Sequence, residues 1–463
     1  AIDQSMDLRR MKYLLIVLSL FLPVSIFSQD LLGEDCEYVD YIKTIQLTPD
    51  GFQLSPPMIG KSGRLRLSFD DIEGGSKHYR YSIEYCNRDW TTSDLKFNEY
   101  AYGQEENPIR TSGFSQQTYL NYTNYQLFIP NSDIQLEKTG NYLIHVFDAD
   151  QGYIPVFTRR FMVASLDVTP QFTIKTSLDA TQYRTHQRLE LRIPLPSFSL
   201  SDPLNDITCV IMQNGWWEQA VTIHPTYVSN EYLEFNEFEK LTFPAVRQFR
   251  QIDLRNIKSR SRNIQALELY GRDVVAFVDD DKPRDNREFE GVDFNGRFII
   301  DRRTNLSSSE LQIVKDSVAV YNPLTNEYGK EEVVIHAANP NASREQVQSE
   351  YVFTNFILKT KPYQPGTEIY LMGQVSDWKC NPYFQLKYNP DEDGYTGEFP
   401  LKQGIYNYLY GLSTDGGKTY DFDQTEGNLF ETENEYTVLV YYRPFGARND
   451  ELIGFRTMAP LRR

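Results

Sequence analysis

The sequence predicts an all-β protein composed of several β-sandwich domains in tandem. Tyrosine and phenylalanine are abundant, with 32 and 28 of the 463 residues, and aromatic residues favour β-strands. Many short segments alternate apolar and polar residues with a period of two, which is typical of strands with one buried face. Asn-Gly and Asp-Gly pairs stand between such segments, as tight hairpin turns require. Long segments of helical periodicity are nearly absent, so we expect sheets packed on sheets.

The clearest alternating segments are residues 64–71, 78–85 and 188–195. In the first of them, Leu65, Leu67 and Phe69 fall on one face of the strand and should be buried. Turn signals stand at Asn214-Gly215, Asn295-Gly296 and Asp415-Gly416. Each of these pairs is expected to connect neighbouring strands.

The N-terminal segment has the pattern of a secretory signal peptide. Arg9, Arg10 and Lys12 precede an apolar run that ends near the small residue Ser28. A basic start, a short apolar run and a small residue at the cleavage point are the parts of such a peptide. The run is too short to span a bilayer well. We therefore predict that residues 1–28 are removed and that the rest of the chain is exported.

The remaining chain is long enough for about three domains. A linker at residues 164–170 follows an apolar strand and marks the first boundary. The predicted divisions are a first sandwich at residues 29–165, a second at 166–345, a third at 346–445 and a C-terminal tail at 446–463.

Charge and cysteine content restrict the possible partners and sites. The formal net charge is −17, which makes nucleic acid an improbable partner because its phosphates repel an acidic surface. Cys36 and Cys86 fall in the same predicted domain and are a candidate disulfide in an oxidising compartment. Cys209 and Cys380 fall in different domains and are expected to be buried thiols. No two cysteines have the spacing of a structural zinc site.

No catalytic motif stands out. The five histidines include no HExxH or similar ligand spacing, and the sequence has no nucleophile elbow, phosphate-binding loop or dinucleotide fingerprint. Acidic side chains are numerous, yet a glycosidase needs two of them facing each other across a cleft, and nothing in the sequence indicates such a pair. The residues themselves therefore indicate no catalytic, cofactor-binding or metal site.

Residues 371–411, near the C-terminus, resemble early-set immunoglobulin-like modules, which include glycogen- and starch-binding domains. The fold class is thus expected to be tandem immunoglobulin-like or early-set sandwiches. Such modules bind sugars by stacking exposed aromatic rings on them, and Trp378 matches the first ring position. No second tryptophan follows, so Tyr420 would have to replace it. Glucan binding through Trp378 is therefore the alternative function, and packing of Trp378 inside the domain is the expected role.

Several segments together resemble the plug proteins of the type IX secretion system. They include residues 81–95, 210–221, 369–378 and 430–454, in order along nearly the whole exported chain. The resemblance implies a periplasmic protein at the inner side of the outer membrane. It implies one partner, a very large outer-membrane β-barrel translocon, whose periplasmic opening the plug seals when no substrate is in transit. It also implies no enzymatic activity, no small-molecule substrate and no membrane contact except through the barrel.

Two segments supply candidate contacts with that partner. The first holds Arg443, Phe445 and Arg448, and the second holds the adjacent Trp216 and Trp217. Arginine and aromatic residues are enriched among the residues that dominate protein interfaces. The alternative for the first segment is that it pins the last strand onto the third sandwich. Of the two tryptophans, one should face the core and the other should point outward, since neighbours on a strand alternate.

Overall fold

The computed structural model describes residues 31, 33–284, 293–302, 313–322, 327–337 and 346–458. Within these ranges the chain consists mainly of antiparallel sheets, which confirms the predicted all-β class. The helices α2 (Phe97–Tyr100) and α3 (Pro203–Asp206) are single turns, and the described residues 346–348 are helical too. No helix in the described part of the chain is long and apolar enough to cross a bilayer. The predicted signal peptide lies outside the described residues.

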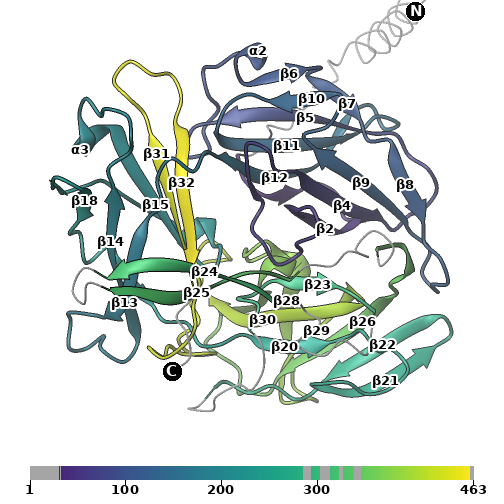
Figure 1. Ribbon diagram of the computed structural model, residues 1–463. Coiled ribbons are helices and arrows are strands. Elements are labelled where there is room, and N and C mark those ends of the chain that lie inside the picture. The colour runs from purple at the N-terminus through teal and green to yellow at the C-terminus, as the bar shows by residue number, and fades with distance from the viewer. Residues whose placement is uncertain are drawn as a thin grey trace, which may run out of the picture. The chain divides into compact units, whose positions relative to one another are not determined.

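The first sandwich packs two sheets against each other (Figure 1). One sheet has the order β1-β12-β11-β5-β7, with β3 beside β12, and the other has the order β2-β4-β9-β8. The strands of the first sheet are β1 (Cys36–Glu37), β3 (Met58–Gly60), β5 (Tyr79–Cys86), β7 (Glu106–Pro108), β11 (Gly140–Asp148) and β12 (Ile154–Ala164). Those of the second are β2 (Ile42–Pro49), β4 (Leu65–Asp71), β8 (Thr111–Phe114) and β9 (Thr123–Ile129). A small ribbon joins β6 (Ala101–Gly103) to β10 (Ile134–Leu136).

The burial of strand β4 depends both on the periodicity of its residues and on its tertiary contacts. Leu65, Leu67 and Phe69 are fully buried in the core between the two sheets, as the alternation predicts. The residues on the other face, Ser68 and Asp70, are fully buried too. That face is covered because the third sandwich packs against it, through Lys402 of β29.

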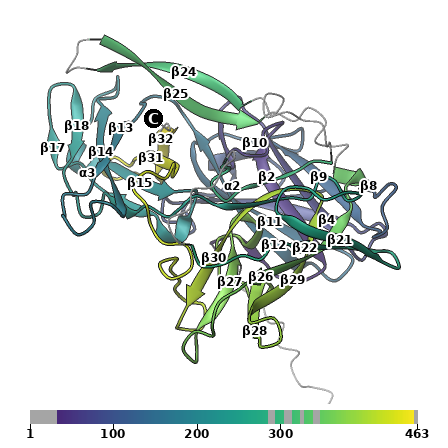
Figure 2. The same ribbon diagram turned by 90° about the horizontal axis from the view of Figure 1, so that it is seen from below.

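The second sandwich draws its strands from two distant parts of the chain. One sheet has the order β13-β14-β18-β17, with β19 beside β14, and the other has the order β16-β15-β31-β32. Its central strands are β13 (Gln171–Thr176), β14 (His186–Pro194), β15 (Ile207–Gln213), β16 (Val221–Ile223), β17 (Tyr227–Val228), β18 (Tyr232–Phe235) and β19 (Thr242–Pro244). The C-terminal strands are β31 (Tyr436–Tyr442) and β32 (Glu451–Met458). Figure 2 shows these yellow C-terminal strands among the teal strands of the second sandwich.

The third sandwich is one long sheet that folds around a single core. Its order is β20-β30-β27-β28-β29-β26-β22-β21, with β23 beside β30. The strands are β20 (Arg250–Asp253), β21 (Ile264–Tyr270), β22 (Asp273–Val278), β23 (Phe298–Ile300), β26 (Tyr351–Leu358), β27 (Glu368–Met372), β28 (Gln385–Asn389), β29 (Gly394–Lys402) and β30 (Gly404–Ser413). A separate antiparallel hairpin joins β24 (Ile313–Asn322) to β25 (Glu327–Ala337).

The strand pairing differs from the predicted division of the chain. Strand β31 pairs with β15 along its whole length, so the end of the predicted third domain completes the second sandwich. Strands β20 to β23, placed by prediction in the second domain, belong to the third sandwich. The predicted tail contains β32, whose Leu452 is fully buried. The boundaries failed because alternating strands of the two sandwiches look alike, and only their long-range partners distinguish them.

Candidate partner-binding site

The turn between β31 and β32 presents one aromatic side chain to solvent. Phe445 is fully exposed, with a relative exposure of 102%, the largest value among the bulky hydrophobic residues that the structure describes. The backbone N–H of Ala447 donates to the carbonyl of Pro444 across 3.0 Å and closes the turn. Gly446 has a φ of +83°, a conformation that other residues adopt only with strain. The turn therefore has a defined backbone, and the ring of Phe445 projects from it.

The base of this turn is anchored in the first sandwich. The carboxylate of Asp450, only 1% exposed, accepts hydrogen bonds from the backbone N–H and the Nη1 of Arg88, at 2.9 and 2.8 Å. The hydroxyl of Tyr85 donates to the carbonyl of Asp450 across 2.6 Å. Because Arg88 and Tyr85 come from β5 and the loop after it, the first sandwich holds a turn that is formed by the other end of the chain.

Both candidate arginines of this turn are already bound within the chain. Arg443 donates its backbone N–H to Asp206 and places its guanidinium 3.6 Å from Asp450. Arg448 forms an ion pair with Glu99 in the first sandwich. The pKa of Glu99 is lowered, first by the backbone N–H of Lys96 and then by Arg448. Of the residues predicted to contact a partner here, Phe445 alone is fully exposed.

The four tryptophans of the chain form two pairs, each at a junction between sandwiches. Trp216 is completely buried and packs against Trp378 of the third sandwich, with ring centroids 4.7 Å apart. Trp217 turns to the first sandwich and meets Trp90 edge-on at 4.9 Å. The guanidinium of Arg160 lies 4.9 Å from the Trp90 ring centroid and strengthens this contact.

Trp216 and Trp217 are therefore domain-joining residues. The prediction that one faces a core is confirmed for Trp216. The predicted partner contact is wrong for Trp216, since no external protein can reach it. Trp217 points away from that core but packs on Trp90. The two residues are not on a strand, as the prediction assumed: Trp217 begins the 3₁₀ turn Trp217–Gln219, and Trp216 directly precedes it.

Trp378 does not present a sugar-binding face. It is 7% exposed and lies between Trp216 and Phe249. Gly296 approaches the ring so closely that a Cβ at that position would collide with it. Tyr420, the required second ring, is partly buried in the same cluster beside Phe422. Stacking on sugars needs exposed ring faces, so the structure contradicts the alternative role of Trp378.

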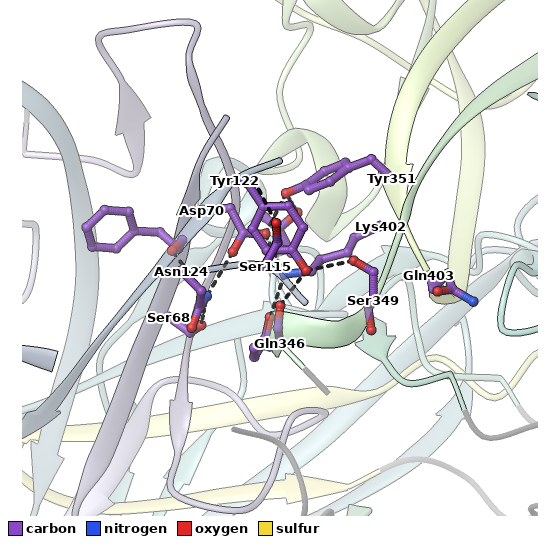
Figure 3. A network of polar contacts seen from close by, with 12 residues as sticks. Ser68, Asp70, Ser115, Tyr122, Asn124, Gln346, Ser349, Tyr351, Lys402 and Gln403 are labelled. Carbon is purple, nitrogen blue, oxygen red and sulfur yellow. Dashed lines mark hydrogen bonds and ion pairs between the residues drawn. The ribbon is translucent and has the colours of Figure 1, made fainter. Parts of the chain in front are cut away.

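A buried ion pair joins the first and third sandwiches (Figure 3). The ammonium of Lys402 lies 2.5 Å from Oδ2 of Asp70, and both side chains are fully buried. Asp70 also accepts from the hydroxyl of Tyr351 at 2.6 Å and from Nδ2 of Asn124 at 2.8 Å. Burial lowers the pKa of Lys402, and the charge of Asp70 opposes this effect.

Tyr122 extends the same network to the segment directly before β26 of the third sandwich. Its ring centroid lies 4.3 Å from the ammonium of Lys402, a cation–π contact. Its hydroxyl donates to the carbonyls of Gln346 and Ser349, at 2.8 and 2.7 Å. The ammonium of Lys402 is thus enclosed by the carboxylate of Asp70 and by the ring of Tyr122.

A second charged contact between the same two sandwiches is only partly enclosed. Arg159 of β12 donates to Glu37 at 2.8 Å and lies 3.1 Å from Asp377 of the third sandwich. These ion pairs and the tryptophan pairs connect the sandwiches, while the indole N–H groups of Trp90 and Trp216 are buried without a hydrogen-bond partner. We conclude that the junctions hold the sandwiches in one arrangement.

Comparison with known proteins identifies the first sandwich. Residues 42–165 match the family model described as the type 9 secretion system plug protein 1st domain. The first sandwich is therefore a type 9 secretion system plug protein 1st domain. The family assignment predicted from the sequence is confirmed for this N-terminal part. For the second and third sandwiches the resemblance stays a prediction.

A solved structure is similar to this protein over nearly the whole chain. It is the crystal structure of a hypothetical protein from Parabacteroides merdae, with 26% sequence identity and a TM-score of 0.79. The match covers 92% of this chain and 99% of that one. No curated protein matches. The arrangement of all three sandwiches is therefore shared with another protein, which is described as hypothetical, without a function.

The cysteines of the chain do not form the predicted pair. All four are free thiols. Cys36 on β1 and Cys86 on β5 lie three strands apart in one sheet, which is about 14 Å at ~4.8 Å per strand. A disulfide requires Cα atoms within about 7 Å. Burial raises the pKa of Cys209 well above its ordinary value and that of Cys380 to about 12, so both are protonated thiols.

The described part of the chain shows no candidate metal site. Among its residues, no cluster of His, Cys, Asp and Glu side chains could hold a metal ion. His145, for example, is buried and is bound by Thr158 and Glu84, at 2.9 and 3.0 Å. The family is one of secretion-system plug proteins and not of enzymes.

Proposed function

We propose that this protein is a periplasmic plug subunit of the type IX secretion system. It binds the outer-membrane β-barrel translocon and seals its periplasmic opening when no substrate is in transit. The observation that carries the proposal is the match of residues 42–165 to the first domain of the plug proteins. Export by the predicted signal peptide would place the protein on the required side of the outer membrane.

The architecture supports this role. A seal must keep its shape against a wide opening, and a specific interface needs about 1,000 Å² or more of contact. Sandwiches joined by the Lys402–Asp70 pair and by packed tryptophans form a suitably stiff body. The net charge of −17 keeps the surface polar, so binding can remain reversible.

Affinity capture tests the proposal. The full chain, tagged at its C-terminus, is incubated with detergent-solubilised outer membranes from cells that lack it, and captured proteins are identified by mass spectrometry. We expect the translocon barrel to be recovered. Cells without the protein should also admit a large hydrophilic antibiotic, because the barrel stays open. If the barrel is not captured and permeability is unchanged, the proposal is wrong.

Sugar binding is tested in parallel. Because Trp378 is enclosed by Trp216 and Phe249, maltooligosaccharides should leave the tryptophan fluorescence of the protein unchanged. Saturable quenching, together with retention on insoluble glucan, would support a carbohydrate-binding role instead.

A further inference from the structure

We propose that the β31–β32 turn is a preformed aromatic anchor, and that Phe445 inserts into an apolar socket on the periplasmic rim of the translocon barrel. The inference rests on the proposed function and names the contact that function would use. It is carried by the exposure of Phe445, by the fixed backbone of its turn and by the way in which two sandwiches hold that turn.

The exposure of Phe445 leaves its full apolar surface available for binding. Its relative exposure is 102%, whereas the next most exposed bulky hydrophobic residue, Tyr102, is at 75%. Burying a phenylalanine completely strengthens binding by about ten- to a hundredfold, given the usual transfer free energy of such side chains. The side chain of Tyr102 can hydrogen-bond to water through its hydroxyl. The side chain of Phe445 has no polar atom, so its exposure to water is less favourable.

The turn is already in a binding conformation. Its backbone is closed by the hydrogen bond from Ala447 to Pro444. One end is fixed by Arg443, whose N–H donates to Asp206 across 2.8 Å, and the other by the buried Asp450. A partner that accepts Phe445 therefore does not need to order a flexible loop, which preserves affinity.

The first sandwich positions this anchor. Arg88 and Tyr85 hold Asp450, and Glu99 holds Arg448. The first sandwich, which matches the plug family, thus fixes the orientation of the turn between β31 and β32. Arg88 and Glu99 are positioning residues, because they act on the turn and leave Phe445 exposed.

The chemistry of the turn favours a protein socket over a membrane. Its tip, residues 444–447, carries no charge, and the flanking Arg443 and Arg448 are paired with Asp450 and Glu99. One aromatic side chain is too little for stable membrane attachment, which needs two lipid-binding signals. The net charge of −17 also opposes approach to anionic headgroups. An enclosed apolar socket on a protein meets all these conditions.

The experiment compares three full-length forms in the capture assay described above: wild type, Phe445→Ala and, as the matched control, Tyr102→Ala. Both replaced side chains are exposed, so both variants should unfold at the wild-type temperature. We expect Tyr102→Ala to capture the barrel like the wild type, and Phe445→Ala to need at least tenfold more protein for half-maximal capture. Phe445→benzoylphenylalanine should form a photo-cross-link to apolar residues of the barrel.

The outcomes separate the two proposals. If the wild type captures the barrel and Phe445→Ala captures it equally well, the anchor is wrong and the plug function stands. If the wild type captures no barrel, both proposals fall. Binding of the wild type, but not of Phe445→Ala, to protein-free vesicles of outer-membrane phospholipid would replace the protein socket with a membrane contact and overturn the inference.

Discussion

Lys402 and Asp70 show how much one residue pair contributes to the relation between domains. They are 332 positions apart, and both are completely removed from water. The desolvation of two buried charges can outweigh their attraction, so such a pair adds little net stability. Removing one partner is different, because it leaves the other charge buried alone. The pair therefore disfavours every arrangement in which the first and third sandwiches separate or slide.

We predict that Lys402→Met destabilises the protein by about 3–5 kcal/mol, since Asp70 is then left without its cation. Adding Asp70→Asn should recover part of the loss, because the amide oxygen is neutral and can still accept from Tyr351. Urea unfolding followed by fluorescence measures both effects. Lys387→Met, at an exposed position of β28, is the control. Equal stability of Lys402→Met and this control would contradict the prediction.

At the scale of elements, the turns follow local chemistry closely. Asn214 and Gly215 both have positive φ, at 52° and 78°, directly after β15. Asp415 organises the loop after β30, where its carboxylate accepts from the N–H and hydroxyl of Thr419, at 3.0 and 2.7 Å. These hydrogen bonds, with that from the backbone of Thr419 the strongest, lower the pKa of Asp415 to about 2. A short polar side chain thus closes its own loop.

The pKa of Asp415 makes this loop sensitive to acid. A carboxyl whose pKa is lower in the folded state stabilises that state above its unfolded pKa of about 4, and the contribution is lost as the pH falls toward 2. Carbon-detected NMR should therefore show Asp415 titrating near pH 2. Thr419→Val, which removes one donor, should raise the midpoint. A midpoint near 4 in the unmodified protein would show that the loop hydrogen bonds do not form in solution.

At the scale of the whole molecule, two separate segments of the chain contribute strands to the second sandwich. The chain forms β13 to β19, then the third sandwich, and returns to add β31 and β32. The sheet that contains β15 cannot be completed without the last strands of the chain. Two covalent connections therefore join these sandwiches, and their folding is coupled.

This topology predicts that a fragment of residues 166–345 will not fold, because β15 lacks its neighbour β31 and its apolar face stays in water. A fragment of residues 166–458 has all strands of both sandwiches and should give the dispersed amide spectrum of a folded β protein. Two-dimensional NMR and circular dichroism distinguish the cases. A folded, monomeric 166–345 fragment would show that the C-terminal strands are dispensable.

Much of the site could not be predicted because exposure is a property of the folded chain. Trp216 and Trp217 were candidate partner contacts by residue type, but they join sandwiches to one another. Arg443 and Arg448 likewise find Asp450 and Glu99 within the chain. Phe445 is exposed because Pro444 and Gly446 form a tight turn on which no other segment packs among the residues that the structure describes. The Cys36–Cys86 pairing failed because sharing a domain says nothing about strand order.

The sequence by itself determined the all-β class, the position of the strands with the clearest alternation and of the Asn-Gly and Asp-Gly turns, and the family of the first domain, since period-two alternation, turn residues and motifs are local properties of the chain. Only the tertiary structure decided which strands share a sheet, that β31 and β32 return to the second sandwich, and which aromatic residues stay exposed. The physical reason is that strand pairing and burial depend on contacts between residues hundreds of positions apart, and equally alternating strands can satisfy many such pairings until the whole core selects one.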